Sequence, residues 1–432
     1  VLTGVFAGVN TAQADAKTEI TLWHYFSTEG SQQRFQEYVD EFNAQSDKTE
    51  VKVTVLPFAD FKKQLTVGAA ASSLPDLAMI DNSSRDERKV ADYLTEQLKM
   101  LGCDVYEDDV AKDVGGNAGN IHARLKGTKE GSVLFMAHMD RVQNGIGIKP
   151  VIKDDKMYSD GSTILAADDL SGVAAILDGL RKIKESGNEH VDIEVIFSVC
   201  EEVGLQGSLH LKCGDIKSKF GYVLDSPGRI GRILDSAMGK AQMYLHVKGK
   251  SAHAAYPELG NSALRAAILT LSQIEDGRVD DETVINWSYL VSETPFNAIS
   301  DKAEAKGLAM SRDNSKLQAY LDKYVKTAAE ISKQTGADIE AEYHIDYPSF
   351  YVKEGDSIDY AVKALKRIGV TPSIEHGAGG FDANRMNGYG IEMIGLSTGY
   401  SKNHTVNEVL ELEDLVKSGE LVEAIINEYS GN

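Results

Sequence analysis

Val133-Leu134-Phe135-Met136-Ala137-His138-Met139-Asp140 is the segment most informative about the architecture of this chain. Its apolar first half predicts a buried strand, and that strand delivers His138 and Asp140 to its carboxyl end. The two side chains lie on the same side of the strand because they are two positions apart. A satisfied histidine at a strand end is the alternative interpretation of this stretch taken alone. Charged groups are rarely buried unless they pair or bind metal, so the stretch predicts a polar site at the end of a central strand.

Four further stretches carry acids or a histidine in a similar setting. Each follows or ends an apolar run that predicts a buried strand. They are Ala167-Asp168-Asp169, Cys200-Glu201-Glu202, Leu224-Asp225-Ser226 and Asn403-His404-Thr405. Together with the first stretch they supply histidines, a bridging carboxylate, terminal carboxylates and one spare acid for proton transfer. This is the set of groups that a two-metal hydrolase needs.

The paired acids Glu201 and Glu202 directly follow a mostly apolar run. Their carboxylates would repel each other, and one would be driven neutral unless a cation lay nearby. A metal supplies that cation and binds one carboxylate, while the neighbouring one stays free to take a proton from water. The pair Asp168-Asp169 has an ordinary alternative, because a following helix favours acids at its N-terminus. Which of these two aspartates binds metal is left open by the residues alone.

The bulk composition narrows the classes of function. A chain of 432 residues is expected to form two or three domains. Its formal net charge of −21 argues against binding to a nucleic-acid backbone, which requires basic patches. The three cysteines have no metal-knuckle or redox spacing and imply no disulfide framework, which suits a reducing compartment. No stretch reaches the length of a transmembrane helix, so no membrane partner is expected.

Residues 1–16 resemble the end of a truncated signal peptide. Val1 to Val9 is small and apolar, and Thr11-Ala12-Gln13-Ala14-Asp15-Ala16 resembles a signal-peptidase site. An arbitrary apolar terminus is the alternative interpretation. The signal-like start predicts export, whereas the enzyme-like remainder described below weakly favours the cytoplasm.

Residues 17–82 predict a partial βαβαβ segment. They resemble the start of an extracellular sugar-type solute-binding protein, in "ITLWHYF", "FQEYVDEFNAQ", "VKVTVLP" and "SSLPDLAMID". A complete receptor of that kind has two lobes with the ligand between them, and most of both lobes is absent. Sugar binding is therefore not carried over, and a receptor fragment of an import transporter is the alternative from a different functional class.

The pattern changes near residues 81–84, and the remainder divides by composition. Residues 83–236 and 348–432 alternate apolar strands with helices, which predicts an α/β domain. Residues 237–347 predict a separate unit with strand, helix, two strands, helix and strand in that order. This β-α-β-β-α-β order is typical of a ferredoxin-like α+β unit.

From about residue 84 onward the chain resembles the peptidase T-like dinuclear zinc metallopeptidases, a superfamily that includes aminoacylase and the carboxypeptidase G type. The resemblance rests on the ordered motifs quoted above and on "ADDLSGVA" and "GLSTGYSKNHTVNE". It implies an α/β catalytic domain with a mixed sheet flanked by helices, and an inserted lid and dimerisation domain that forms a homodimer. It also implies release of the N-terminal residue of short peptides by a water bridged between two Zn²⁺ ions. Co²⁺ or Mn²⁺ would suit the same ligands.

The resemblance also implies roles for individual residues. Glu201 would be the general base, and Asp140 would lie behind a metal ligand. The metal ligands would be His138, Asp168 as the bridge, Glu202, Asp225 and His404.

Four residues of the substrate side follow from the same resemblance. His253 and Asn297 match lid residues, and the lid histidine, often from a partner subunit, helps to hold the carbonyl oxygen of the transition state. Gly380 lies in a glycine-rich turn that matches a loop close to the substrate. Relatives carry an Arg-Ser pair where this chain has Met310-Ser311, so Arg312 is the candidate replacement for a carboxylate contact. Hydrolysis of N-acyl amino acids or carboxypeptidase activity by the same chemistry is the alternative enzymatic function.

Overall fold

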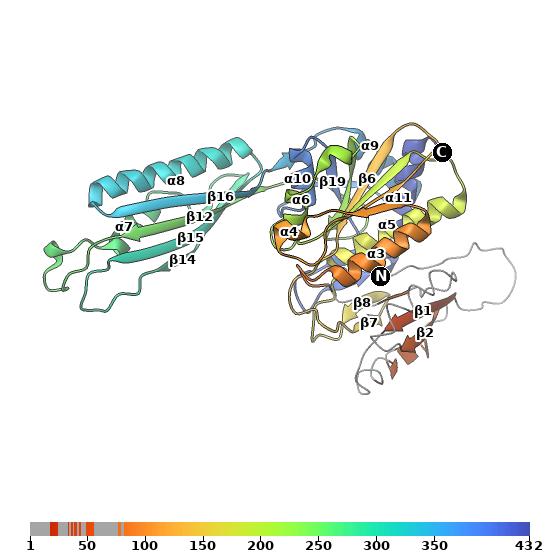
Figure 1. Cartoon of the computed structure of the whole chain (residues 1–432), viewed down its shortest axis with the longest axis horizontal. Coiled ribbons are helices and arrows are strands. Elements are labelled where there is room, and N and C mark those ends of the chain that lie inside the picture. Colours follow the sequence, from red (N-terminus) through yellow and green to blue (C-terminus); the bar gives the residue numbers. More distant parts are fainter. Residues whose placement is uncertain are drawn as a thin grey trace. The chain divides into compact units, whose positions relative to one another are not determined.

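The computed structural model describes residues 82–432 continuously, and only parts of the chain upstream of them (Figure 1). The upstream parts are strands β1 (Thr18–His24), β2 (Thr49–Val55) and β3 (Leu77–Ala78), with scattered residues between 33 and 44. β1 pairs in parallel with both β2 and β3. These are the three strands expected within residues 17–82. The signal-like residues 1–16 lie outside the described residues, as does much of the receptor-like segment, and that resemblance stays a prediction.

The chain forms two compact units, which are described separately. The main unit comprises residues 1–235, 352–375 and 381–432, and the inserted unit comprises residues 236–351 and 376–380.

A mixed sheet flanked by helices forms the main unit, as the sequence predicts. Its strands run in the order β11-β19-β10-β6-β9-β5-β4, and β18 (Ser373–His376) pairs with β11. The neighbours β19, β10, β6 and β9 are parallel, whereas β11, β5 and β4 are antiparallel to their neighbours. The bounds in chain order are β4 (Asp104–Glu107), β5 (Ile121–Leu125), β6 (Ser132–His138), β9 (Asp192–Ser198), β10 (Phe220–Ser226), β11 (Arg232–Ala237) and β19 (Glu392–Ser397).

The central strands are apolar along nearly their whole length because helices cover them. Phe135 in β6 and Tyr222 in β10 are fully buried and stack with ring centroids 5.6 Å apart. Strands buried on both faces carry continuous apolar runs rather than alternating ones, which is why the run at 133–137 predicted this strand. The helices of the main unit are α3 (Arg88–Leu101), α4 (Ala111–Val114), α5 (Ala167–Ser186), α6 (Gln206–Leu209), α9 (Asp356–Arg367), α10 (Asp382–Gly388) and α11 (Leu412–Ser430). Of these, α5 packs on β6 and β10, α9 packs on β10 and β19, and α11 packs against α5 and α9.

A small sheet of order β20-β21-β8-β7 lies at the C-terminal motif. Its strands are β7 (Pro150–Lys153), β8 (Lys156–Ser159), β20 (Tyr400–Ser401) and β21 (Val409–Glu411). Because β20 and β21 pair with each other and β21 pairs with β8, the connection that carries His404 is anchored at both ends.

The prediction that a buried strand leads to Asp168-Asp169 is wrong, because residues 162–167 form no strand. The backbone N–H groups of Leu165 and Ala166 donate to Glu408 Oε2, at 2.9 and 2.8 Å, rather than to a neighbouring strand. Apolar residues in this run are buried without being paired in a sheet, a case that apolar composition alone cannot distinguish from a strand.

The inserted unit has the β-α-β-β-α-β order expected for its sequence, with two short extra strands, β13 and β17. Its elements are β12 (Gly239–Lys248), α7 (Ala263–Leu271), β13 (Gly277–Arg278), β14 (Thr283–Val291), β15 (Lys302–Ser311), α8 (Asn314–Thr335), β16 (Asp338–Tyr347) and β17 (Phe350–Tyr351). The sheet order is β13-β14-β15-β12-β16, and α7 and α8 pack together on it (Figure 1). The buried cluster between them includes Leu245, Ala267, Leu321 and Tyr324.

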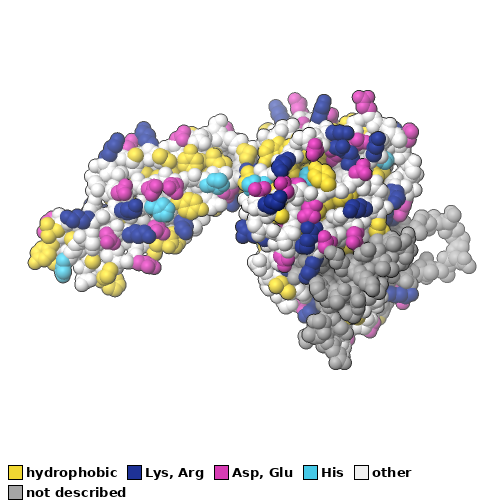
Figure 2. Space-filling view, in the orientation of Figure 1, with side chains coloured by type: hydrophobic (Ala, Val, Ile, Leu, Met, Phe, Trp, Pro, Cys, Tyr) yellow, Lys and Arg dark blue, Asp and Glu magenta, His cyan; other side chains and the backbone are white. Residues whose placement is uncertain are grey.

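Charged side chains of both signs are interspersed over the face of the molecule drawn in Figure 2. The acidic side chains on this face are thus spread out rather than gathered in one patch. None of the helices in the described part of the chain combines the length and apolar character needed to cross a bilayer.

Candidate metal centre

The chemistry-bearing residues meet where the parallel strands end. His138 is the last residue of β6, Asp225 lies near the end of β10, and Glu201-Glu202 follow the end of β9. Parallel strands bring their carboxyl ends to one edge of the sheet, which is where open α/β sheets bind ligands. Asp168 joins them from the start of α5.

One group of side chains surrounds His138, which is 1% exposed. His138 Nε2 lies 3.2 Å from Asp168 Oδ1 and 4.0 Å from Asp225 Oδ2. The Tyr400 hydroxyl donates to Asp225 Oδ1 at 2.8 Å and thereby orients this carboxylate.

A second group surrounds His404, which is half-exposed and lies in the connection between β20 and β21. His404 Nε2 lies 3.0 Å from Glu202 Oε1 and 3.2 Å from Asp168 Oδ2. Asn403 Nδ2 donates to the same Asp168 oxygen at 2.6 Å. The carboxylate of Asp168 therefore presents one oxygen to each histidine.

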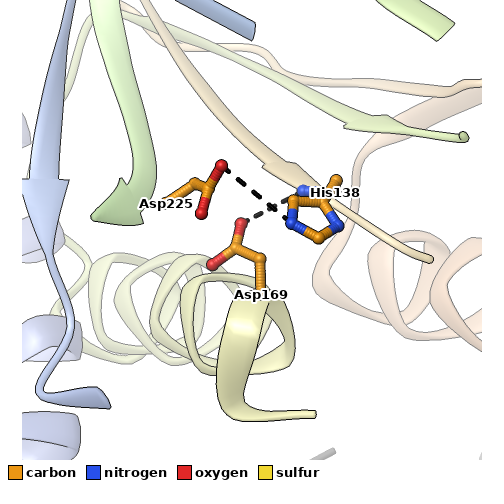
Figure 3. Close-up of side chains that lie close together, drawn as sticks. All are labelled: His138, Asp169 and Asp225. Carbon is orange, nitrogen blue, oxygen red and sulfur yellow. Dashed lines mark hydrogen bonds and ion pairs between the residues drawn. The ribbon is translucent and has the colours of Figure 1, made fainter. Parts of the chain in front are cut away.

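Two overlapping sets of ligand atoms within the described residues lie close enough to hold a metal ion. They are His138, Asp169 and Asp225, and His138, Asp168 and Glu202. Figure 3 draws the first set, in which the Asp169 and Asp225 side chains point toward His138 from α5 and β10.

Asp168 and Asp169 differ in what their carboxylates contact. Asp169 Oδ2 accepts the backbone N–H of His138 at 3.1 Å, and Asp169 Oδ1 accepts that of Gly172 at 3.3 Å. Asp169 thus ties the end of β6 to the first turn of α5, whereas Asp168 faces the two imidazoles.

The electrostatics of the cluster favour a bound cation. Burial, together with neighbouring carboxylates, raises the pKa of Glu201 and Asp225 well above the ordinary range. Burial opposes ionisation of Asp168 as well, but its hydrogen bonds with His138 and His404 outweigh burial and lower its pKa. The hydrogen bonds to Asp168 and Glu202 raise the pKa of His404 to about 10. Imidazole and carboxylate donors crowded in this way fit a divalent metal, whose charge would offset the repulsion.

The residues that support the cluster were not singled out by the sequence. Glu408 is buried, and its Oε1 accepts the backbone N–H of Asp168 at 3.0 Å, in addition to the two amides of the preceding run. Burial raises the pKa of Glu408 to about 6. Glu408, Tyr400 and Asn403 all belong to the C-terminal motif that contains His404, but nothing in their spacing marks them as pointing inward.

The four substrate-side candidates lie in the inserted unit, in two places. His253 forms a β-bridge with Ala298, and the Ala254 N–H donates to Asn297 O at 2.8 Å, so His253 and Asn297 lie on adjacent segments. Both are beyond the carboxyl end of β12, where Lys248 pairs with Lys302.

The other two candidates lie toward the opposite end of the same strand pair, where Gly239 pairs with Ser311. Arg312 Nη2 donates to Gly377 O at 3.3 Å, in the glycine-rich turn. A Cβ at Gly380 would lie 2.2 Å from the ring of Tyr347, so glycine is needed for this close approach.

Comparison with known proteins agrees with this architecture. Residues 134–428 match the model of peptidase family M20/M25/M40. The "Uncharacterized protein YqjE" of Bacillus subtilis is 37% identical over 356 residues, which are 82% of this chain and 96% of that protein. The aminopeptidase PepT of Bacillus cereus is 36% identical and superposes with a TM-score of 0.78 over 85% of this chain and 98% of its own. A Staphylococcus aureus tripeptidase is 29% identical, with a TM-score of 0.79 over 86% of this chain and 99% of its own.

The family match covers more than half of the chain and includes all five strand-end motifs. The chain belongs to peptidase family M20/M25/M40.

Proposed function

We propose that this metal-dependent peptidase is a tripeptide aminopeptidase-like enzyme that releases the N-terminal residue of short peptides with two metal ions. The observation that carries the proposal is the position of Asp168, whose two carboxylate oxygens each face a different histidine at 3.2 Å. A carboxylate placed in this way can bridge two cations. The Bacillus cereus aminopeptidase and the Staphylococcus aureus tripeptidase support the choice of substrate.

The proposed ligands divide into two half-sites that share Asp168. His138 and Asp225 would complete one half-site, and His404 and Glu202 would complete the other. We propose zinc in both, and cobalt or manganese would fit the same mixture of imidazole and carboxylate ligands.

The contacts of His138 Nδ1 support a role for this residue as a metal ligand through Nε2. Its Nδ1 lies 3.0 Å from the backbone oxygen of Asp140 and 3.4 Å from Asp140 Oδ1. An imidazole that donates Nδ1–H to such acceptors keeps its Nε2 lone pair for a metal.

Glu201 is the proposed general base. When bound, the metal ions would polarise the scissile carbonyl and make the attacking water more acidic. Glu201 takes a proton from that water as the water oxygen forms a bond to the carbonyl carbon. It then gives the proton to the amine nitrogen as the C–N bond breaks, which yields a free amino acid and a shortened peptide.

The geometry of the inserted unit supports action of His253 in a partner subunit. The ten residues of β12 separate the His253 end of the sheet from the Arg312 end, a span of about 30 Å at the usual rise per residue. One short peptide cannot contact both ends within a single chain. In a homodimer assembled through the inserted unit, His253 and Asn297 of one chain would serve the site of the other.

Two alternatives remain less well supported. A deacylase or carboxypeptidase would use the same cluster but is not favoured by the relatives. A solute-binding role rests on a segment that lies largely outside the described residues, and it stays a prediction. The weakly favoured cytoplasmic location, and export as its alternative, stay predictions as well.

Replacement of Asp168 and of Asp169 should have different effects on metal binding. We expect Asp168→Asn to lose most of the zinc bound by the native chain, because both half-sites lose a charged ligand. Asp169→Asn, the matched control, should keep its zinc and lose about 1–3 kcal/mol of stability, because its partners are backbone amides. Zinc content after dialysis and the urea midpoint measure the two effects, and zinc loss only in Asp169→Asn would reverse the assignment.

Glu201→Gln should remove turnover without removing metal. We expect kcat to fall about 10²–10⁴-fold, since the amide cannot accept the proton. Glu202→Gln, its neighbour, should instead weaken zinc binding. Tripeptide hydrolysis and zinc titration distinguish the two variants, and a normal kcat for Glu201→Gln would exclude it as the base.

A free tripeptide should be a better substrate than its N-acetylated form. We expect kcat/KM to be about 100-fold higher or more for the free peptide, the discrimination available when a site binds a polar group that the analogue has lost. Parallel assays of both peptides and of an N-acyl amino acid test this. Faster cleavage of the acylated compounds would favour the deacylase alternative.

Two inactive variants should complement each other if the lid histidine acts in the partner's site. Co-expressed His253→Ala and Glu201→Gln chains would form mixed dimers with one complete site. Random pairing would restore roughly a quarter of native activity. Dimers should also sediment at twice the chain mass of 47.0 kDa. Active mixtures support the proposal, whereas inactive mixtures of properly dimeric protein would place His253 in its own chain's site.

A further inference from the structure

The segment Asn82–Glu87, which follows the N-terminal stretch of the chain, lies directly against the end of β6. Ser83 forms a parallel bridge with Arg141, and Asn82 Nδ2 donates to the backbone oxygen of Met139. These contacts align the segment beside the residues that follow His138.

Two buried carboxylates hold three consecutive backbone N–H groups of the turn that carries Glu201 and Glu202. Glu87 Oε1 accepts the Cys200 N–H at 3.1 Å. Asp140 Oδ1 accepts the Glu201 N–H at 3.0 Å, and Asp140 Oδ2 accepts the Glu202 N–H at 3.3 Å. Three consecutive N–H groups are thus bound by side-chain oxygens, and this arrangement fixes the backbone of the turn.

The conformation of the turn requires such support. Cys200 has a φ of 54°, in the left-handed region that non-glycine residues rarely adopt. Conformations of this kind cost on the order of 1–3 kcal/mol and persist only where the surroundings hold them. Glu87, which is fully buried, bonds to the N–H of this very residue.

Ser84 also supports this turn, through a hydrogen bond to Asp140. Its hydroxyl donates to Asp140 Oδ2 at 2.6 Å, the same oxygen that accepts the Glu202 N–H. Asp140 is fully buried, so the serine hydroxyl orients a carboxylate that has little access to water.

We propose that Ser84 and Glu87 are positioning residues for catalysis, which rests on the proposed roles of Glu201 and Glu202. Ser84 acts through Asp140, and Glu87 acts through the backbone of Cys200. Both side chains come from the segment that precedes α3. This segment therefore helps to position the catalytic residues and does more than link the N-terminal stretch to α3. Misplacement of a base or ligand by as little as 1 Å is enough to lower the rate strongly.

Substitution of Ser84 tests the first arm. Ser84→Ala should lower kcat and zinc affinity by about 10–100-fold, the range seen when a group supporting a metal ligand is removed, with little change in KM. Ser84→Thr keeps the hydroxyl and should restore both values to within a few-fold. Ser418→Ala is the matched control, because Ser418 is also buried in the main unit and donates to Asp414 O at 2.7 Å. It should leave both values unchanged.

Substitution of Glu87 tests the second arm. Glu87→Ala should lower kcat and zinc affinity over the same range, while Glu87→Gln keeps an acceptor for the Cys200 N–H and should lose less. The matched control is Glu194→Gln, since Glu194 is a buried carboxylate that accepts the N–H groups of Lys217 and Ser218 at 3.0 and 2.8 Å.

Zinc titration of the metal-stripped full chain, followed by tripeptide kinetics, gives both readouts. If the variant of Ser84 or of Glu87 has the same zinc affinity and kcat as its control, the proposed positioning role of that residue is wrong. Zinc affinity tests the positioning roles of Ser84 and Glu87 even if the native chain does not cleave peptides. Lack of peptide cleavage by the native chain would instead overturn the proposed function.

Discussion

The crowding of buried carboxylates around two histidines is the constraint on which the main unit depends. Asp168, Glu201 and Asp225 are each at most slightly exposed, and burial pushes the pKa of Glu201 and Asp225 upward. Such a cluster is unfavourable in a folded protein unless its charges are offset. The imidazoles of His138 and His404 offset part of the charge, and a divalent cation in each half-site would offset the rest. This electrostatic demand accounts for the choice of residues at the strand ends.

Further carboxylates of the scaffold accept hydrogen bonds from the backbone around the cluster. Asp140 holds the N–H groups of Glu201 and Glu202, Asp169 holds that of His138, and Glu408 holds that of Asp168. In each case an acid fixes the backbone of a neighbouring residue whose side chain enters the cluster. The cluster is thus surrounded by a shell of acids that position it, which explains why so many acids occur in these motifs.

Much of this arrangement could be predicted from the sequence, and the remainder could not for identifiable reasons. The central strands were predictable because strands buried on both faces carry unbroken apolar runs, as at 133–137. The run at 162–167 misled because it is apolar and buried, yet its amides bond to the side chain of Glu408 instead of a strand. Ser84, Glu87 and Glu408 could not be singled out, since their effect depends on turns whose conformation leaves no periodic signal.

The most direct test of the account is to titrate metal-stripped protein with zinc while the hydrolysis of a free tripeptide is followed. We expect two zinc ions to bind per chain and release of the N-terminal residue to appear as the sites fill. Binding of a single ion with full activity would contradict the shared role of Asp168 in two half-sites. A chain that binds no zinc and cleaves the tripeptide equally well without it would contradict the account as a whole.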